Sequence, residues 1–227
     1  MAAESSTLQR RLREREWQHS AILDAARSLL VEAGEHAVTL RAVAERIGYS
    51  TTVIYQHFPD KQALIQALCD HDFLHLAGAF SQLAKIPHPG ERLHALGREY
   101  VRFALEHPAS FRFMFLTSRS PLPPEDSAIP KGNPAYDGYA LLKQTLSDCQ
   151  QSGLLASHWQ DLELLAQLCW ATVHGIACLH LYAHPHSLWV DWRPAMENTE
   201  KALEIFERGI SRDGQPFANA TPNKKGK

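Results

Sequence analysis

The residues best suited to specific chemistry lie in a short polar segment, residues 50–61, with the sequence STTVIYQHFPDK. Their hydroxyl, amide, imidazole and ammonium groups can donate or accept directed hydrogen bonds. On the outer face of a helix, such groups can reach base edges and phosphates in the major groove of DNA. The candidate contacts are Ser50, Thr51, Thr52, Tyr55, Gln56, His57 and Lys61.

A helix-turn-helix unit is predicted to position these side chains. Thr39 is a suitable N-cap for its first helix, and Gly48 tolerates the positive φ that a tight turn requires. Ala44 is small enough for two helices to cross closely, and Ile54 supplies an apolar anchor on the second helix, 51–58. That second helix is too short to be stable alone, so the surrounding helices must hold it in place.

The helix after this unit adds a feature that favours phosphate. Pro59 ends the short helix, and Asp60 is a suitable cap for a long helix that runs to about Lys85. Free backbone amides at its N-terminus, together with the charge of Lys61, favour a bound phosphate there.

Helical periodicity continues along the rest of the chain, and runs with strand period are short. The apolar spacing predicts further helices over 22–33, 90–107, 108–115, 135–152, 160–183 and 193–211. Residues 118–134 contain five prolines and predict a long loop. We therefore predict an all-α fold.

The segment TVIYQHFPDKQAL, together with the Thr39 cap and the Ala44–Gly48 spacing, resembles the signature of the tetracycline-repressor (TetR) family of bacterial transcriptional regulators. The resemblance covers residues 17–65. It implies an N-terminal three-helix helix-turn-helix DNA-binding domain followed by a C-terminal helical ligand-binding and dimerisation domain, and it implies roles for individual side chains. The implied phosphate contacts are Thr39, Tyr55, His57 and Lys61. The residues nearest the bases are then Ser50, Thr51, Thr52 and Gln56, and Arg41 is a further contact. The segment CWATVHGIACL is similar to a Trp…His-Gly element of one subgroup of this family.

Four regions follow from this interpretation: a basic N-terminal arm over 1–16, the DNA-binding domain over 17–65, a regulatory and dimerisation domain over 66–212, and a disordered tail over 213–227. The arm carries Arg10, Arg11, Arg13 and Arg15, and is expected to track the DNA backbone or the minor groove.

The charge of the chain shows no overall bias towards nucleic acid. The formal net charge of the 227 residues is −2, and within residues 1–65 eight Lys and Arg residues are matched by eight Asp and Glu residues. Affinity for DNA would therefore depend on the placement of charge and on dimerisation. Thr52, Gln56 and His57 also fit an inert or packed surface, and the ring of Tyr55 fits a core position.

Several other functions are disfavoured. The GxSxG, Gly-rich phosphate-loop and HExxH motifs do not occur in the sequence, so we expect neither an enzyme nor a cofactor. Four cysteines lack CxxC spacing, and the pair His180 and His184 lies at a helix end without a neighbouring carboxylate, so we expect no metal site. The N-terminus has no apolar signal core, which predicts a cytoplasmic protein.

The apolar stretch 162–184 is interrupted by Glu163, Gln167, His174 and His180, which favours a helix packed in protein over a membrane span. We expect a homodimer through about 160–183 and 193–211, the second segment using the stripe Met196, Leu203, Phe206 and Ile210. Gly175 inside the first segment predicts the close approach of a neighbouring helix.

An apolar effector pocket is the remaining expectation, and a solid core is the alternative. Its predicted lining is Tyr100, Phe103, Phe111, Met114, Phe115, Trp170 and His174, with the proline-rich loop 118–134 as a gate. The favoured function is a homodimeric, ligand-responsive DNA-binding regulator that acts as a repressor. Two alternatives stay open: a helical adaptor that uses the 39–61 face for protein contacts, and a constitutive DNA binder without an effector.

Overall fold

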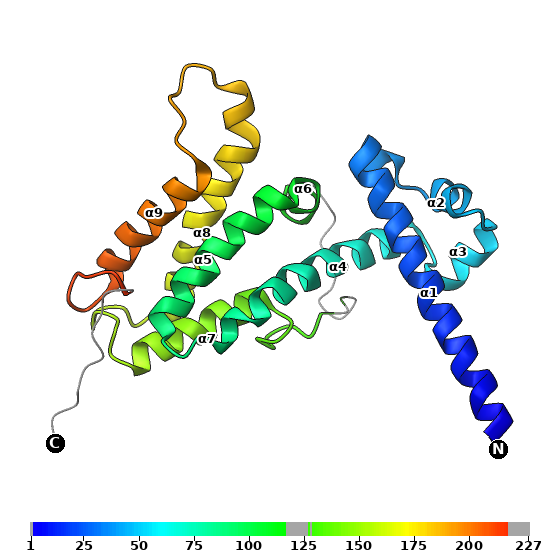
Figure 1. Ribbon diagram of the computed structural model, residues 1–227, viewed down its shortest axis with the longest axis horizontal. Coiled ribbons are helices and arrows are strands. Elements are labelled where there is room, and N and C mark those ends of the chain that lie inside the picture. Colours follow the sequence, from blue (N-terminus) through cyan, green and yellow to red (C-terminus); the bar gives the residue numbers. More distant parts are fainter. Residues whose placement is uncertain (1, 117–126, 128, 218–227) are drawn as a thin grey trace. The chain divides into compact units, whose positions relative to one another are not determined.

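The computed structural model describes residues 2–116, 127 and 129–217, which form nine α-helices with short single-turn helices between them and no β-strand (Figure 1). The prediction of an all-α fold is confirmed. Two compact units are present: the first comprises Met1–Asp72 with Arg112–Ala128, and the second comprises Phe73–Phe111 with Ile129–Lys227. The division falls inside α4 (Lys61–Ser81), as does the boundary predicted after residue 65.

The first unit contains α1 (Ala2–Ala33), α2 (Leu40–Ile47), α3 (Thr51–His57) and the beginning of α4. Helix α1 packs against α2, and α2 packs against α3. Their contact is made by aliphatic side chains that are buried on the inner faces, including Ile22, Ala26, Val43, Ala44 and Ile54. This core holds the seven residues of α3, which are too few to form a stable helix alone.

The predicted basic arm is not a separate segment. Residues Ala2–Ala33 form one continuous helix, so the four arginines lie on the N-terminal half of α1 rather than ahead of it. The reason is local: the run LQRRLRERE consists of strong helix formers, and neither Gly nor Pro interrupts residues 2–33.

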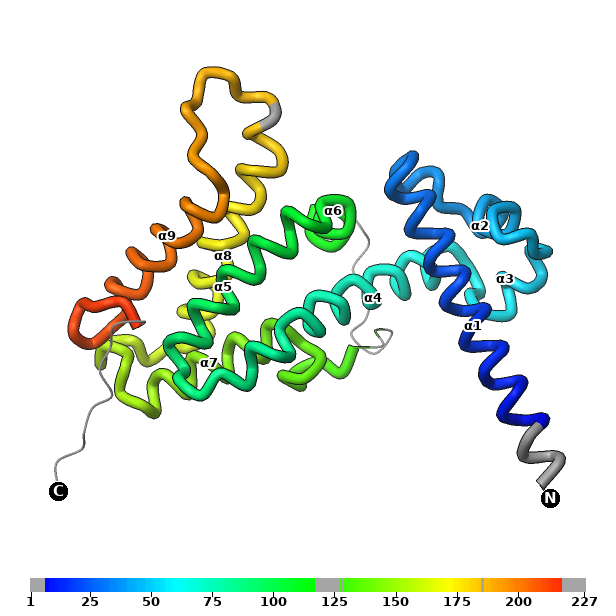
Figure 2. Tube along the Cα trace, in the orientation of Figure 1, coloured from blue at the N-terminus to red at the C-terminus, as the bar shows by residue number. Residues whose placement is uncertain are grey.

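The second unit is built around α5 (Pro89–Glu106), which packs against α7 (Gly138–Gln151), α8 (Leu162–Cys178) and α9 (Ala195–Ile210). After α8 the chain continues through a turn of π-helix, loops back, and returns along α8 as α9 (Figure 2). Helix α6 (Pro108–Phe115) begins in this unit and ends in the first. Gly97 on α5 allows a close crossing, because an added Cβ would lie 2.6 Å from Leu203 Cδ2 of α9.

The predicted disordered tail is wrong for its first residues. Phe217 is buried against the core formed by α5, α7 and α8, and its backbone N–H donates to Glu207 Oε2 at 3.1 Å. Residues 218–227 lie outside the described part of the chain. Most of the predicted loop 118–134 does too, since only Ser127 and residues from Ile129 onwards are described there.

Helix α9 uses its predicted stripe within its own chain. Leu203 and Ile210 are buried, and Phe206 packs on the core cluster, so these residues do not face a second subunit as expected. The opposite face of α9 instead exposes Ile205, at 71% of its surface. A helix can pack only one of its faces on the core of α5, α7 and α8, so the side chains on the other face of α9 stay at the surface.

Helix α8 also leaves an apolar stripe uncovered. Leu164 and Leu168, one turn apart, are exposed at 47% and 39%, and Leu179, directly after the end of α8, is exposed at 52%. A Cβ added to Gly175 would meet no atom within 4 Å in the described part of the chain, so the predicted close neighbour is not found among these residues. The stretch Leu162–Ala183 is long and apolar enough to span a membrane, with a mean hydropathy of 1.5, and 22% of it is buried in the chain.

Candidate nucleic-acid interface

The turn between α2 and α3 has the geometry that the sequence predicts. Thr39 adopts an extended conformation, and its hydroxyl accepts a hydrogen bond from Ala42 N at 3.0 Å, which caps α2. Gly48 ends α2 with φ of +70° and ψ of +26°, in the left-handed region that favours glycine. The roles predicted for these two residues in the fold are confirmed.

The outer face of α3 is a continuous polar surface. Ile54 is completely buried and anchors the helix, whereas Thr51, Thr52, Tyr55 and Gln56 are exposed. The exposed ring of Tyr55, at 57% of its surface, rules out the alternative that this residue belongs to the core. Ser50 occupies the N-cap position without making a side-chain capping bond, so its exposed hydroxyl is not used to cap the helix.

The N-terminus of α4 lies immediately after this face. The Asp60 carboxylate accepts from Ala63 N at 2.8 Å, as its predicted capping role requires. Lys61 is exposed in the first turn, and its ammonium group donates to the carbonyl of Glu35 at 3.3 Å. Because a carbonyl carries no net charge, this bond does not neutralise Lys61, and the ammonium group stays available to an anion.

His57 is more constrained than the other predicted contacts. It is half-buried at the end of α3, and its Nε2 lies 3.2 Å from Gln18 Oε1 of α1. Burial, and to a lesser extent His19 and Arg15, hold the pKa of His57 below its ordinary range. The ring is therefore neutral at pH 7 and donates from Nε2 to the Gln18 amide oxygen.

Arg41 is highly exposed, but it forms an ion pair with Glu45 one turn later, with Nε 2.8 Å from Oε1. Arg46 is held by Glu32 of α1 through two bonds of 2.6 Å. A bidentate pair of this kind ties α1 to α2 and cancels the charge of Arg46. Glu45 and Glu32 are therefore paired with Arg41 and Arg46 and do not offset the other arginines. For this reason a domain with no net charge can still expose positive charge at other positions.

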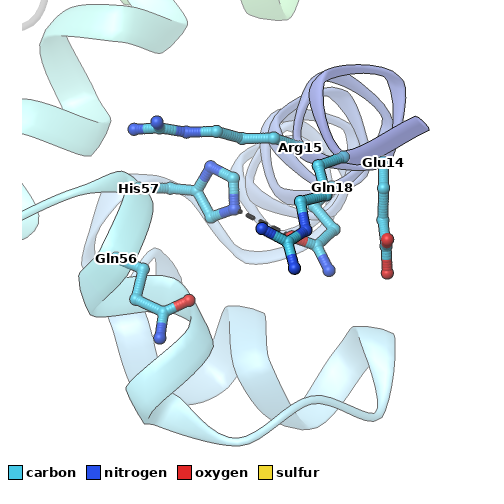
Figure 3. A pocket seen from close by; sticks show the side chains of 6 residues that line it. Glu14, Arg15, Gln18, Gln56 and His57 are labelled. Carbon is cyan, nitrogen blue, oxygen red and sulfur yellow. Dashed lines mark hydrogen bonds between the residues drawn. The ribbon is translucent and has the colours of Figure 1, made fainter. Parts of the chain in front are cut away.

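A groove that the sequence interpretation missed lies between α1 and the end of α3 (Figure 3). Its volume is about 410 Å³, and its lining residues are Arg11, Glu14, Arg15, Gln18, Gln56 and His57. The helical spacing of Arg11, Arg15 and Gln18 predicts that they share one face of a helix. Only the fold shows that this face of α1 lies beside His57.

Four of the predicted pocket residues converge in the second unit. Trp170 Nε1 donates to the Tyr100 hydroxyl at 3.0 Å, and this hydroxyl lies 2.8 Å from His174 Nδ1. Burial lowers the pKa of His174, so its ring is neutral and can accept a hydrogen bond from the Tyr100 hydroxyl through Nδ1. The ring of Phe111 lies 5.3 Å from His174 and 5.9 Å from Tyr100, measured between centroids. The result is an aromatic cluster with a polar centre.

The other three predicted pocket residues are placed differently. Phe103 is buried beside His75 and His107, with ring centroids 5.3 Å and 4.8 Å away. Met114 and Phe115 belong to the first compact unit. Among the described residues, no group of three or more His, Cys, Asp or Glu side chains is arranged to hold a metal ion.

Two family models match the chain. The model described as bacterial regulatory proteins of the tetR family matches residues 22–68, and the model described as a tetracyclin repressor-like C-terminal domain matches residues 93–197. The first match contains α2, α3 and the exposed polar face. The second contains Tyr100, Trp170 and His174.

Curated relatives resemble the first unit. The chain is 45% identical over 47 residues to an uncharacterized HTH-type transcriptional regulator, YvkB, from Bacillus subtilis, which is 21% of this chain and 25% of that protein. It is 40% identical over 53 residues to the class A tetracycline repressor protein from Escherichia coli, and these residues cover 23% of this chain and 24% of that protein. The chain thus matches about a quarter of the length of these relatives.

Solved structures resemble the whole fold. A protein of unknown function from Rhodococcus sp. RHA1 has a TM-score of 0.71 and 28% identity, with 86% of this chain and 95% of that chain covered. SmeT, the repressor of a Stenotrophomonas maltophilia multidrug efflux pump, has a TM-score of 0.63 and 21% identity, with coverage of 92% and 96%. With both its N-terminal and its C-terminal segments matched by models of one family, the chain belongs to the TetR family of bacterial regulatory proteins.

Proposed function

We propose that this protein is a dimeric DNA-binding transcriptional repressor that acts in the cytoplasm and is released from its operator by a small apolar or aromatic effector. The observation that carries the DNA-binding part is the exposed polar face of α3, anchored from below by Ile54 and followed by Lys61. A helix with this face fits the major groove, where hydrogen-bonding side chains can read base edges.

The proposed contacts divide into two groups. Thr39, Tyr55, His57 and Lys61 contact phosphates and fix the register of the helix on the duplex. The residues closest to the bases are Ser50, Thr51, Thr52 and Gln56, and Arg41 is a further contact once it leaves Glu45. His57 is the least accessible of these, because its ring is held against α1 by Gln18.

The test is a gel-shift assay with the promoter DNA beside the protein's own gene, followed by selection of bound fragments from genomic DNA. Retention of one fragment in preference to the rest supports the proposal. A protein that retains no DNA while binding another protein through the same face is the helical adaptor of the alternative interpretation. The relatives' printed names, which include transcriptional regulators and a tetracycline repressor, favour the regulator.

A homodimer is proposed because exposed apolar side chains of α8, of the turn after it and of α9 would be buried in it. Leu164, Leu168, Leu179 and Ile205 are large and apolar, and Gly175 leaves space for a helix to approach closely. Two copies that pair these surfaces form a four-helix interface in which each copy contributes both helices. A second copy fits better than lipid, because Glu163 at the start of α8 is ion-paired with Lys143 at 2.8 Å.

The proposed effector site is the cluster of Tyr100, Phe111, Trp170 and His174. Its rings would contact an apolar ligand, and its hydrogen-bonded centre would accept or donate one directed bond. The Trp170 and His174-Gly175 pattern supports membership of the Trp…His-Gly subgroup, since this pattern lies inside the matched C-terminal domain.

A thermal-shift screen with apolar compounds tests the effector, and each ligand found is then tested for release of DNA. Trp170→Ala should weaken the response to the ligand and leave DNA binding intact. A ligand that binds this cluster without changing DNA affinity would favour the constitutive DNA binder.

A further inference from the structure

Helix α1 extends far beyond the part of the chain that the family model matches. That match begins at residue 22, whereas α1 begins at Ala2, so about five turns of helix precede it. Four of the six residues that line the groove beside α3 come from this extension. The groove is therefore a feature that the matched segment does not contain.

Positive charge in the groove is concentrated on one face of the extension. Arg11, Arg15 and Gln18 are separated by four and three residues, which places them on the same side of the helix. Within the described residues, neither arginine makes an ion pair, in contrast to Arg41 and Arg46. Their charges are therefore free to bind an anion.

The opposite wall comes from α3. Gln56 and His57 line the groove there, and the bond between Gln18 and His57 joins the two walls (Figure 3). The amide of Gln18 is oriented by this bond. Glu14 is the one carboxylate among the lining residues, so the groove keeps a net positive charge with His57 neutral.

We propose that this groove binds a phosphodiester of the DNA strand next to the major groove that α3 enters. Arg11 and Arg15 supply the positive charge. Gln56 lies between the bound phosphate and the bases, and Gln18 orients the ring of His57. The proposal rests on the proposed DNA-binding function and adds a contact outside the helix-turn-helix unit.

The geometry favours the backbone over the minor groove that the sequence interpretation allowed. An α-helix with its side chains is about 10–12 Å across, whereas the minor groove is about 6 Å wide. A continuous helix cannot enter it as an extended arm would. The helix can instead lie beside the strand and present the face that carries Arg11 and Arg15 to one of its phosphates.

The test compares the salt dependence of binding to the selected operator. Each neutralised phosphate contributes about 0.9 to the slope of log K against log salt concentration. Arg11→Ala with Arg15→Ala removes one contact from each half-site, so the slope of the dimer should fall by about 1.8. Between 50 and 200 mM salt, the wild type should then lose about tenfold more affinity than the variant.

Arg13→Ala is the matched control. Arg13 is two residues from both groove arginines and lies about 200° around the helix axis from Arg11, so it does not face the groove. Its removal should leave the slope within about half a unit of the wild type. All three positions are exposed on a helix, so alanine preserves the fold, and circular dichroism checks this.

Phosphate ethylation locates the contact. One ethylated phosphate per half-site should weaken the wild type and have no effect on the double variant. Equal slopes for the double variant, the control and the wild type would overturn the groove while the proposed function stands. A wild-type protein that binds no DNA would overturn both.

Discussion

Replacing His94 with glutamine should destabilise the protein at low pH and much less at high pH. His94 of α5 lies between two carboxylates of α9: Nδ1 is 2.7 Å from Glu207 Oε1, and Nε2 is 3.0 Å from Glu200 Oε2. The bond to Glu207, followed by the bond to Glu200, raises the pKa of His94 above its ordinary value. The charged imidazole donates from both nitrogens and joins the two helices.

The direction of the pH effect follows from linkage. Because the pKa of His94 is higher in the folded than in the unfolded protein, its stabilisation is complete below the unfolded pKa, about 6.5. The stabilisation is lost as the pH rises through the folded pKa. A glutamine has no such titration, so the difference between the two proteins should shrink as the pH rises.

The magnitude depends mainly on Glu207. This side chain is 2% exposed and also holds Phe217 N, whereas Glu200 is 40% exposed and can bind water in place of His94. A buried hydrogen bond between charged groups contributes about 1.5–3 kcal/mol, and an exposed one contributes little. We therefore expect His94→Gln to lower the free energy of unfolding by about 2 kcal/mol at pH 5.5.

Urea unfolding at pH 5.5, 7 and 9, at one protein concentration, measures this difference. His158→Gln, which removes an exposed histidine of the same unit, is the control and should change stability equally little at each pH. The reasoning is refuted if the His94 variant is destabilised by the same amount at pH 5.5 and pH 9.

Three further outcomes are expected. Gln56→Ala should lose about 1–3 kcal/mol of discrimination between bases at one position of each half-site, whereas Lys61→Ala should weaken binding to all DNA sequences alike and lower the salt slope by about one unit per half-site. If both variants behave identically on every DNA, the division between base and phosphate contacts is wrong. Leu168→Arg with Ile205→Arg should shift the protein from dimer to monomer in sedimentation at micromolar concentration and weaken DNA binding, because both side chains lie on the uncovered stripes; an unchanged dimer would place the interface elsewhere. Tyr100→Phe removes a buried hydroxyl with two hydrogen-bond partners and should lower the free energy of unfolding by about 2 kcal/mol, measured in urea; a loss below about 0.5 kcal/mol would mean that the polar centre contributes nothing.

The sequence by itself determined the helix-turn-helix unit, because the signals for it are local. The Thr39 cap, the left-handed Gly48 and the buried Ile54 depend on residues within a few positions of one another. The exposed face of α3 follows from the same periodicity, since burying Ile54 turns its polar neighbours outwards.

Only the tertiary structure decided which surfaces of the other helices are covered. In α9 the periodicity alone could not show that Leu203 faces its own core and Ile205 faces outwards. Phe217 seemed to belong to a polar tail, yet the space beside Gly90 receives its ring. The bond between Gln18 and His57 joins residues 39 positions apart, and no local pattern encodes it. Such contacts depend on how whole helices pack, so their partners become known only when the chain is folded.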